Sequence, residues 1–116
     1  MESRELANRI TEIIVDRQGE DIVLLDLTEV TTFTDYFVIC TAGSRRQLDA
    51  LQNAIREGVK QSEEQLVALN VEGDPDSGWV LVDYNSVIIH LFSDEMRKYY
   101  RLEELWSNAR TIARIQ

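Results

Sequence analysis

Three aspartates at or near the ends of predicted strands could hold a divalent cation; they are Asp26, Asp35 and Asp83. Carboxylates at strand ends bind Mg²⁺ in enzymes that transfer phosphoryl or nucleotidyl groups. Such sites usually need two carboxylates at alternate positions of one strand, so that both side chains point the same way. Asp26 instead has Leu24 and Thr28 at those positions, and Asp83 also lacks an acidic partner there. We therefore expect a capping or turn role for each aspartate.

The chain has one histidine and one cysteine, His90 and Cys40. His90 lies in the middle of a predicted strand, within diagonal reach of Asp83, and an Asp–His pair can tune a general base. The sequence shows no motif with an activated serine or cysteine to act as a nucleophile beside it. Cys40 lies within an apolar strand and is most simply a small core residue. We therefore predict no catalytic residue, no metal site and no cofactor, and a structural role at an interface for His90.

The chain of 116 residues is acidic, with 12 Lys and Arg against 21 Asp and Glu and a net charge of -9. A field of this sign repels phosphate groups, which argues against clamping DNA or RNA as a main role and against binding to an anionic membrane. The charge is also uneven, because residues 97–116 carry five basic and two acidic side chains, which leaves -12 for residues 1–96. Such asymmetry can orient the approach to a charged partner.

The sequence gives no sign of export or of a membrane anchor. Its first residues follow neither the basic-then-apolar layout of a signal peptide nor the acid-poor layout of a transit peptide. No apolar run approaches the about 18 residues of a membrane-spanning helix. A lone cysteine forms no intramolecular disulfide, which suits a reducing compartment. We therefore expect a cytoplasmic protein.

Apolar periodicity predicts helices and strands in the order α-β-β-α-β-β-β-α. The predicted helices span residues 2–17, 44–64 and 94–113, and the predicted strands span 22–27, 36–41, 66–71, 79–84 and 87–92. Ser44 and Gln47 match a capping box at the start of the second helix, and residues 72–78 form a turn-rich loop.

The final helix is expected to bury one stripe of side chains, namely Leu102, Leu105, Trp106, Ala109, Ile112 and Ala113. The element order is typical of an α/β fold in which helices flank one mixed sheet. No linker, repeat or low-complexity tract interrupts the chain. We therefore predict a single domain over residues 1–116.

The predicted hairpin of residues 79–92 has the most specific geometry. A two-residue turn at Asn85-Ser86 pairs Tyr84 with Val87, and the pairing continues outward along both strands. Because side chains alternate along a strand, six residues then share one face. This face is apolar except for the tyrosine hydroxyl and is expected to be core; it holds Val80, Val82, Tyr84, Val87, Ile89 and Leu91.

The other face of the hairpin is also largely apolar. It pairs Asp83 with Ile88, Leu81 with His90, and Trp79 with Phe92. Either a helix covers this face, or part of it is exposed as a binding surface with aromatic anchors. The pattern alone favours the covered arrangement, because most apolar sheet faces are packed.

Three blocks of the sequence resemble the ribosomal silencing factor (Iojap-like) family. They are Thr34-Asp-Tyr-Phe-Val-Ile-Cys-Thr41 with Ser44-Arg-Arg-Gln47, then Trp79-Val-Leu-Val-Asp-Tyr84 with Val87-Ile-Ile-His-Leu-Phe92, and Tyr100-Arg-Leu-Glu-Glu-Leu-Trp106. The blocks lie in the family's order and extend the resemblance over almost the whole chain. Two positions depart from the family pattern: Asn85-Ser86 replaces a common Gly-Asp, and Ala42 lies where the family has a nearby Gly.

The resemblance implies a function without catalysis. Members of this family bind the large ribosomal subunit through its ribosomal protein fourteen, at the face that meets the small subunit. They block subunit joining sterically and so repress translation. The resemblance also implies a fold similar to that of nucleotidyltransferases but without their paired catalytic carboxylates.

The resemblance also favours partial exposure of the second hairpin face, because the family's matching Trp, Asp, Tyr and His positions fall there or beside it. The residues expected to bind the protein partner are Trp79, Leu81, Asp83, Tyr84, His90, Phe92, Tyr99 and Tyr100. An enzyme that uses the strand-end aspartates with Mg²⁺ is the alternative function. A homodimer through the same face is a further expectation, and the basic C-terminal residues are where any contact with RNA is expected.

Overall fold

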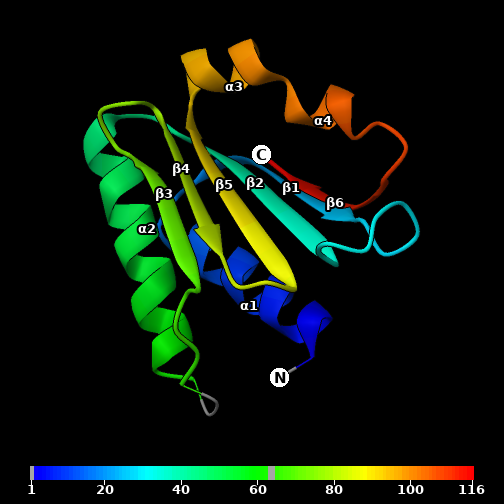
Figure 1. Ribbon diagram of the computed structural model, residues 1–116. Coiled ribbons are helices and arrows are strands. Elements are labelled where there is room, and N and C mark those ends of the chain that lie inside the picture. The colour runs from blue at the N-terminus through cyan, green and yellow to red at the C-terminus, as the bar shows by residue number, and fades with distance from the viewer. Residues whose placement is uncertain (1, 63–64) are drawn as a thin grey trace.

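The computed structural model describes residues 2–62 and 65–116. Two long helices lie on one face of a sheet, and two short helices lie near one end of the other face (Figure 1). The helices are α1 (Ser3–Asp16), α2 (Arg45–Lys60), α3 (Asp94–Tyr100) and α4 (Leu102–Leu105). The strands are β1 (Glu20–Asp26), β2 (Tyr36–Ala42), β3 (Asn70–Asp74), β4 (Trp79–Asp83), β5 (Val87–Ser93) and β6 (Arg110–Ile115).

The sheet has six strands in the order β3-β4-β5-β2-β1-β6. Strands β2 and β5 pair in parallel at its centre, and the other neighbours pair antiparallel. All seven residues of β2 are buried, as expected for a central strand with both faces covered. The predicted α/β class with one mixed sheet is therefore confirmed.

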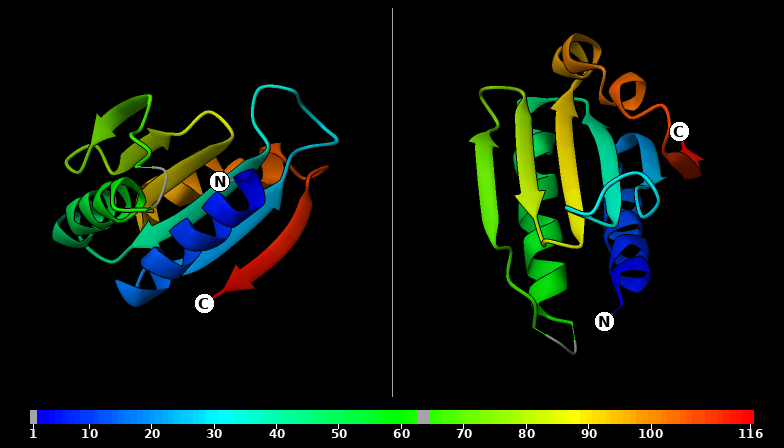
Figure 2. Two further views of the ribbon diagram at one scale, coloured as in Figure 1. Left: turned by 90° about the horizontal axis from the view of Figure 1, so that it is seen from below. Right: turned by 45° about the vertical axis from the view of Figure 1, so that its right-hand side comes forward.

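Helices α1 and α2 pack side by side on the sheet because each presents an apolar stripe to it (Figure 2). Gly58 of α2 lets the two helices approach closely, since a Cβ there would lie 2.6 Å from Ile13 Cδ1. Ser44 caps α2 as predicted, and its Oγ accepts from the Gln47 amide at 3.0 Å. The Gln47 side chain accepts instead from the amide of Gly43, one residue before the cap. The predicted end of this helix at residues 63–64 lies outside the described residues.

The hairpin of β4 and β5 has the predicted register, with Trp79 opposite Phe92 and Leu81 opposite His90. Asn85 has a φ of 71°, which the tight turn requires and which asparagine tolerates. The six residues predicted to form the core face are all buried in one cluster with side chains of α1 and α2.

The predicted final helix over residues 94–113 is wrong. Arg101 adopts a left-handed φ of 50° and ends α3, and the chain then forms the short α4 before β6 pairs with β1. The expected single stripe divides between the two faces of the sheet. Trp106 and Ala109 pack on one face, whereas Ile112 and Ala113 pack against the cluster on the helix side. The apolar residues are therefore spaced as in a helix, although they pack into two different hydrophobic clusters.

The strand predicted at 66–71 lies later, at Asn70–Asp74, and takes the first part of the predicted loop. Gly73 has a φ of 78°, and a Cβ there would collide with the backbone oxygen of Trp79. Residues 70–74 contain residue types that are typical of turns, so the sequence pattern does not predict the strand there. The strand nevertheless requires Gly at position 73, because its backbone approaches β4 closely.

Candidate functional site

The sheet face opposite α1 and α2 carries a band of aromatic side chains, which we call the aromatic face. Its central residues are Trp79, His90, Phe92 and Phe37. Helices α3 and α4 lie over only one end of this face, whereas α1 and α2 run along the other face of the sheet (Figures 1 and 2). The second hairpin face is therefore neither fully covered nor fully exposed. It is packed at its centre and open toward β4.

The degree of burial changes across the aromatic face. Phe92 and His90 of β5 are buried, with 0% and 5% exposure. Trp79, Leu81 and Asp83 of the neighbouring β4 are half-buried. The β4 side chains are therefore accessible from solvent, whereas those of β5 next to them are not.

Two predicted site residues extend the exposed part, and one lies on the other face of the sheet. Tyr99 and Tyr100 of α3 are 74% and 40% exposed. Tyr100 packs on Trp79 with a ring-centroid distance of 4.3 Å. Tyr84 lies on the opposite face, buried in the cluster beneath α1 and α2, because neighbouring positions of a strand point to opposite sides.

The aromatic rings form a continuous network. Trp79 stacks on Phe92 at 5.3 Å, and the Phe37 ring meets His90 edge-on at 4.7 Å. At its other end the network continues through Trp106, which lies 5.6 Å from Phe37 and 5.7 Å from Phe33. Such aromatic pairs orient one another as well as burying apolar area.

Sequence reasoning missed Phe33 and Trp106 as parts of this face. Phe33 is 52% exposed in the loop between β1 and β2. A lone aromatic residue within the polar segment 28–34 was the available signal for it. The helical spacing predicts Trp106 in the stripe of the final helix, whereas in the structure it ends the short α4 and packs against Phe37.

His90 pairs with Trp79 and not with Asp83. The indole Nε1–H of Trp79 donates to His90 Nδ1 at 3.3 Å. Asp83 Oδ1 accepts from the backbone amide of Asn85 at 2.6 Å and so supports the hairpin turn. Burial lowers the pKa of His90 from 6.5 to about 4, which keeps the ring neutral near pH 7. The possible Asp–His general base is therefore not formed.

Acidic side chains border the exposed part of the aromatic face. In the β3–β4 register Glu72 lies opposite Leu81 and Asp74 opposite Trp79, which puts both carboxylates on the aromatic side. A pocket of about 290 Å³ opens here and is lined by Glu72, Gly73, Ser77, Trp79, Leu81, Met96 and Tyr100. The surface thus combines apolar anchors with negative charge at its margin.

Asp26, like Asp83, accepts a hydrogen bond from the backbone amide two residues later, which is the expected turn role. Asp26 Oδ1 accepts from the Thr28 hydroxyl at 2.6 Å and from its amide at 2.9 Å. These bonds, the hydroxyl first, and the nearby Arg110 lower the pKa of Asp26. Within residues 2–62 and 65–116, no three His, Cys, Asp or Glu residues lie together as possible metal ligands. Cys40 is buried, which raises the pKa of its thiol to about 12.

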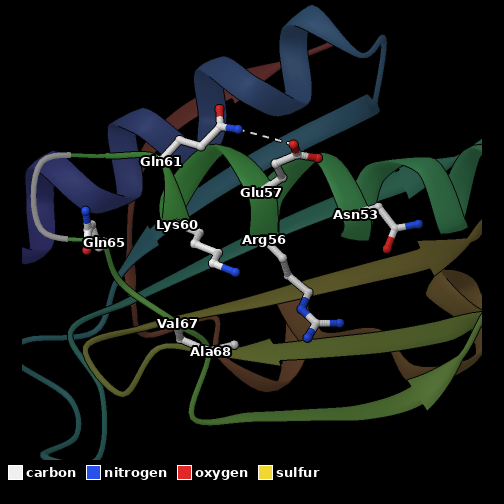
Figure 3. A pocket seen from close by; sticks show the side chains of 8 residues that line it. All are labelled: Asn53, Arg56, Glu57, Lys60, Gln61, Gln65, Val67 and Ala68. Atoms are coloured by element: carbon white, nitrogen blue, oxygen red, sulfur yellow. Dashed lines mark hydrogen bonds between the residues drawn. The ribbon is translucent and has the colours of Figure 1, made fainter.

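A second, polar pocket of about 910 Å³ lies beside α2 (Figure 3). It is lined by Asn53, Arg56, Glu57, Lys60, Gln61, Gln65, Val67 and Ala68. Its side chains come from the outer surface of α2 and from the segment that follows, and Gln61 bonds Glu57 at 3.2 Å. This pocket is separate from the aromatic face.

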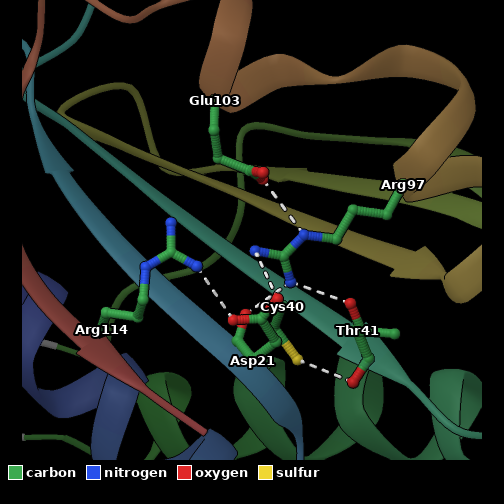
Figure 4. Close-up of polar contacts among 6 residues, drawn as sticks. All are labelled: Asp21, Cys40, Thr41, Arg97, Glu103 and Arg114. Atoms are coloured by element: carbon green, nitrogen blue, oxygen red, sulfur yellow. Dashed lines mark hydrogen bonds and ion pairs between the residues drawn. The ribbon is translucent and has the colours of Figure 1, made fainter.

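A buried arginine fixes α3 and α4 to the sheet (Figure 4). Arg97 is 7% exposed; its Nη1 donates to Thr41 Oγ1 at 2.8 Å and to the Asp21 carbonyl. Its Nε donates to Glu103 Oε1 at 3.1 Å. Arg114 of β6 donates to the Asp21 carboxylate at 3.1 Å. One network therefore joins both short helices to β1, β2 and β6.

The five basic residues of the C-terminal segment each lie within 4 Å of a carboxylate. They are Arg97, Lys98, Arg101, Arg110 and Arg114. Arg97, Arg110 and Arg114 pair with carboxylates of β1 and so help to hold the segment to the sheet. In the part of the chain that the structure describes, no helix has the length and apolar character needed to cross a membrane.

Comparison with known proteins identifies the family. The family model described as "Ribosomal silencing factor during starvation" matches residues 1–116. A ribosomal silencing factor of Halalkalibacterium halodurans is 31% identical over 97% of this chain and 94% of its own length. That of Bacillus subtilis is 36% identical over 81% and 78%. The chloroplastic protein Iojap of Arabidopsis thaliana is 32% identical over 96% of this chain and 45% of its own length.

Solved structures have the same fold. A crystal structure of a Chromobacterium violaceum protein superposes with a TM-score of 0.85 at 33% identity, covering 92% of this chain and 88% of that one. A second, from Bacillus halodurans, superposes with a TM-score of 0.81 at 28% identity, covering 95% and 98%. The chain therefore belongs to the ribosomal silencing factor family.

Proposed function

We propose that this protein represses translation by binding the large ribosomal subunit and sterically blocking its joining to the small subunit. The partner on the large subunit is ribosomal protein fourteen, at the face where the subunits meet. Membership of the ribosomal silencing factor family supports this function. The observation that carries the choice of surface is the half-exposed Trp79 on an acid-bordered aromatic face.

The chemistry of this face suits a basic protein. Trp79, Leu81 and Tyr100 offer a cluster of large apolar anchors, the kind of residues on which interface affinity often depends. Glu72 and Asp74 border them, and the chain carries a net charge of -9. Ribosomal proteins are generally basic, so complementary charge steers them toward this face. Binding of this kind needs no catalytic group, and we place it in the cytoplasm, where ribosomes work.

Sucrose-gradient analysis tests this proposal. Large subunits incubated with the protein before small subunits are added should give fewer joined ribosomes than untreated large subunits. Trp79→Ala should restore joining, because it removes the central anchor from a position that is only half-buried. Val67→Ala is the control, since Val67 is 65% exposed but lies at the polar pocket beside α2. Unchanged joining at saturating wild-type protein would contradict the function.

The free protein is also expected to self-associate through this face, since an exposed apolar surface favours an isologous contact. Dimer and ribosome contact would then compete for one surface. Gel filtration over a dilution series measures this, and Trp79→Ala should shift the protein toward monomer. A monomer at all concentrations would remove the dimer and leave the ribosome proposal intact.

A further inference from the structure

His90 makes a hydrogen bond that restrains the partly exposed Trp79. The indole Nε1–H donates to His90 Nδ1 at 3.3 Å. An indole nitrogen is a donor only, so Nδ1 must accept, and the neutral imidazole carries its proton on Nε2. Nε2 is buried and has no hydrogen-bond partner among the described residues.

Packing alone would favour phenylalanine at this position. The imidazole lies among aromatic rings, 4.7 Å from Phe37 and 6.1 Å from Phe92, and is 5% exposed. A buried donor without a partner destabilises the folded state. A phenyl ring would fill the same space and would bring no buried polar atom of its own. The histidine therefore calls for a reason other than stability.

The orientation of Trp79 supplies this reason. Its ring stacks on Phe92 at 5.3 Å with an interplanar angle of 24°, and Tyr100 packs on it at 4.3 Å. A half turn of the indole about its Cβ–Cγ bond keeps the ring in nearly the same plane, so stacking alone distinguishes the two orientations weakly. The directional N–H···N bond is made in only one of them. The bond thus decides which edge of the indole faces solvent.

We propose that His90 is a positioning residue, which orients the Trp79 indole for recognition of the basic protein partner. The identity of the partner rests on the proposed function. The restraint on the indole is a property of the free protein and can be measured without ribosomes.

Two variants separate this role from a structural one, both in a Trp106→Phe background that leaves Trp79 as the single tryptophan. His90→Phe keeps an aromatic ring but removes the acceptor. His90→Asn keeps an acceptor near the position of Nδ1 but loses the ring. The measurements are the midpoint of thermal unfolding, the anisotropy and acrylamide quenching of Trp79 fluorescence, and the affinity for large ribosomal subunits.

The two variants should change stability and binding in opposite directions. His90→Phe should unfold at the same or a higher temperature, yet show lower anisotropy, stronger quenching and about fivefold weaker binding, the effect of losing one hydrogen bond. His90→Asn should unfold at a lower temperature but keep the indole restrained and bind more tightly than His90→Phe. A purely structural histidine would make affinity follow stability in both.

Unchanged Trp79 fluorescence in His90→Phe, or affinities that follow stability, would overturn the inference. If His90→Phe does not fold, His90→Leu, which also lacks an acceptor, replaces it. If wild-type protein does not bind large subunits, the proposed function fails, and the fluorescence of the free variants still decides whether His90 positions Trp79.

Discussion

At the scale of single residues, the hydrogen bonds of buried polar side chains separate structural roles from roles at the binding surface. Arg97 and His90 are both buried, and within the described part of the chain each has one nitrogen without a hydrogen-bond partner, Nη2 of Arg97 and Nε2 of His90, but they differ in how many bonds the other nitrogens make. Arg97 donates to a hydroxyl, a carbonyl and a carboxylate from three elements, so it stabilises the placement of α3. His90 has one bonded and one unbonded nitrogen within an aromatic cluster. The bonds of Arg97 are typical of a residue that stabilises the fold. The single bond of His90 goes to Trp79, a residue of the proposed binding surface.

Replacement of Arg97 by methionine tests the first role. Arg97→Met keeps much of the apolar stem but leaves Thr41, Glu103 and the Asp21 carbonyl without their donor. We expect a loss of roughly 1.5–3 kcal/mol in the free energy of unfolding, as for hydrogen bonds to charged groups. Urea denaturation measures it. Lys98→Met on the same helix is the control and should change little, because its ion pair with Asp94 is exposed. Equal effects would show that burial of Arg97 contributes nothing.

The His90 titration predicts a pH dependence of stability. Burial lowers the pKa of His90 from 6.5 to about 4 in the folded protein. Between these values the unfolded chain binds a proton that the folded protein does not, so stability falls as the pH falls from 6.5 toward 4. The loss should reach roughly 3 kcal/mol at its lower end. Thermal unfolding over this range checks it, and His90→Phe should lack this part of the pH dependence. A parallel pH dependence in both proteins would contradict it.

At the scale of elements, the edge hairpin of β3 and β4 decides where Trp79 lies. Gly73 makes this pairing possible, since it combines a positive φ with backbone contact at Trp79. The sequence indicated a strand near this position but placed it too early, because Gly, Pro and Asp in residues 72–78 are typical of loops. The partner strand β4 supplies the hydrogen bonds that make residues 70–74 extended.

Gly73→Ala should therefore damage the binding surface. The left-handed backbone costs about 1–2 kcal/mol for a residue with a Cβ, and the new methyl group must also push the backbone oxygen of Trp79 away. We expect lower stability together with weaker binding to large subunits. Gly43→Ala is the matched control, because the atoms that its Cβ meets are the ends of the flexible Glu20 and Gln47 side chains. Circular dichroism melts and subunit pelleting measure both effects.

At the scale of the whole molecule, the distribution of charge is the main feature. The basic C-terminal segment folds back onto the acidic body, where Arg110 pairs with Asp26 and Arg114 with Asp21. Its positive charge is therefore partly neutralised within the molecule. The acidic border of the aromatic face, with Glu72 and Asp74, lies on the edge strand β3 at the far side of the sheet from β6.

This distribution predicts binding that is steered by charge. The association rate with large subunits should fall as the salt concentration rises, because exposed charges are screened. Glu72→Gln should lower this rate and its salt dependence. Glu5→Gln makes the same change of charge on α1, on the opposite side of the sheet, and should have a smaller effect. Stopped-flow fluorescence or surface plasmon resonance measures these rates. Equal effects of the two variants would mean that only total charge matters.

Local patterns in the sequence were enough to predict the central elements and the register of the hairpin. Strands β2 and β5 are long apolar runs, and the turn at Asn85-Ser86 sets the pairing of β4 with β5, so local pattern and turn chemistry were sufficient. The three sequence blocks also pointed to the family, which the comparisons confirmed.

The path of residues 101–115 and the composition of the aromatic face depend instead on long-range packing. Apolar periodicity cannot distinguish one stripe on a helix from side chains that are divided between two faces of a sheet. Residues 110–115 form a strand because they pair with β1 at the edge of the sheet. The same long-range packing places Phe33 and Trp106 beside Phe37. It also makes Trp79, and not Asp83, the hydrogen-bond partner of His90. Contacts between distant segments depend on the whole sheet, and no local pattern in the sequence records them.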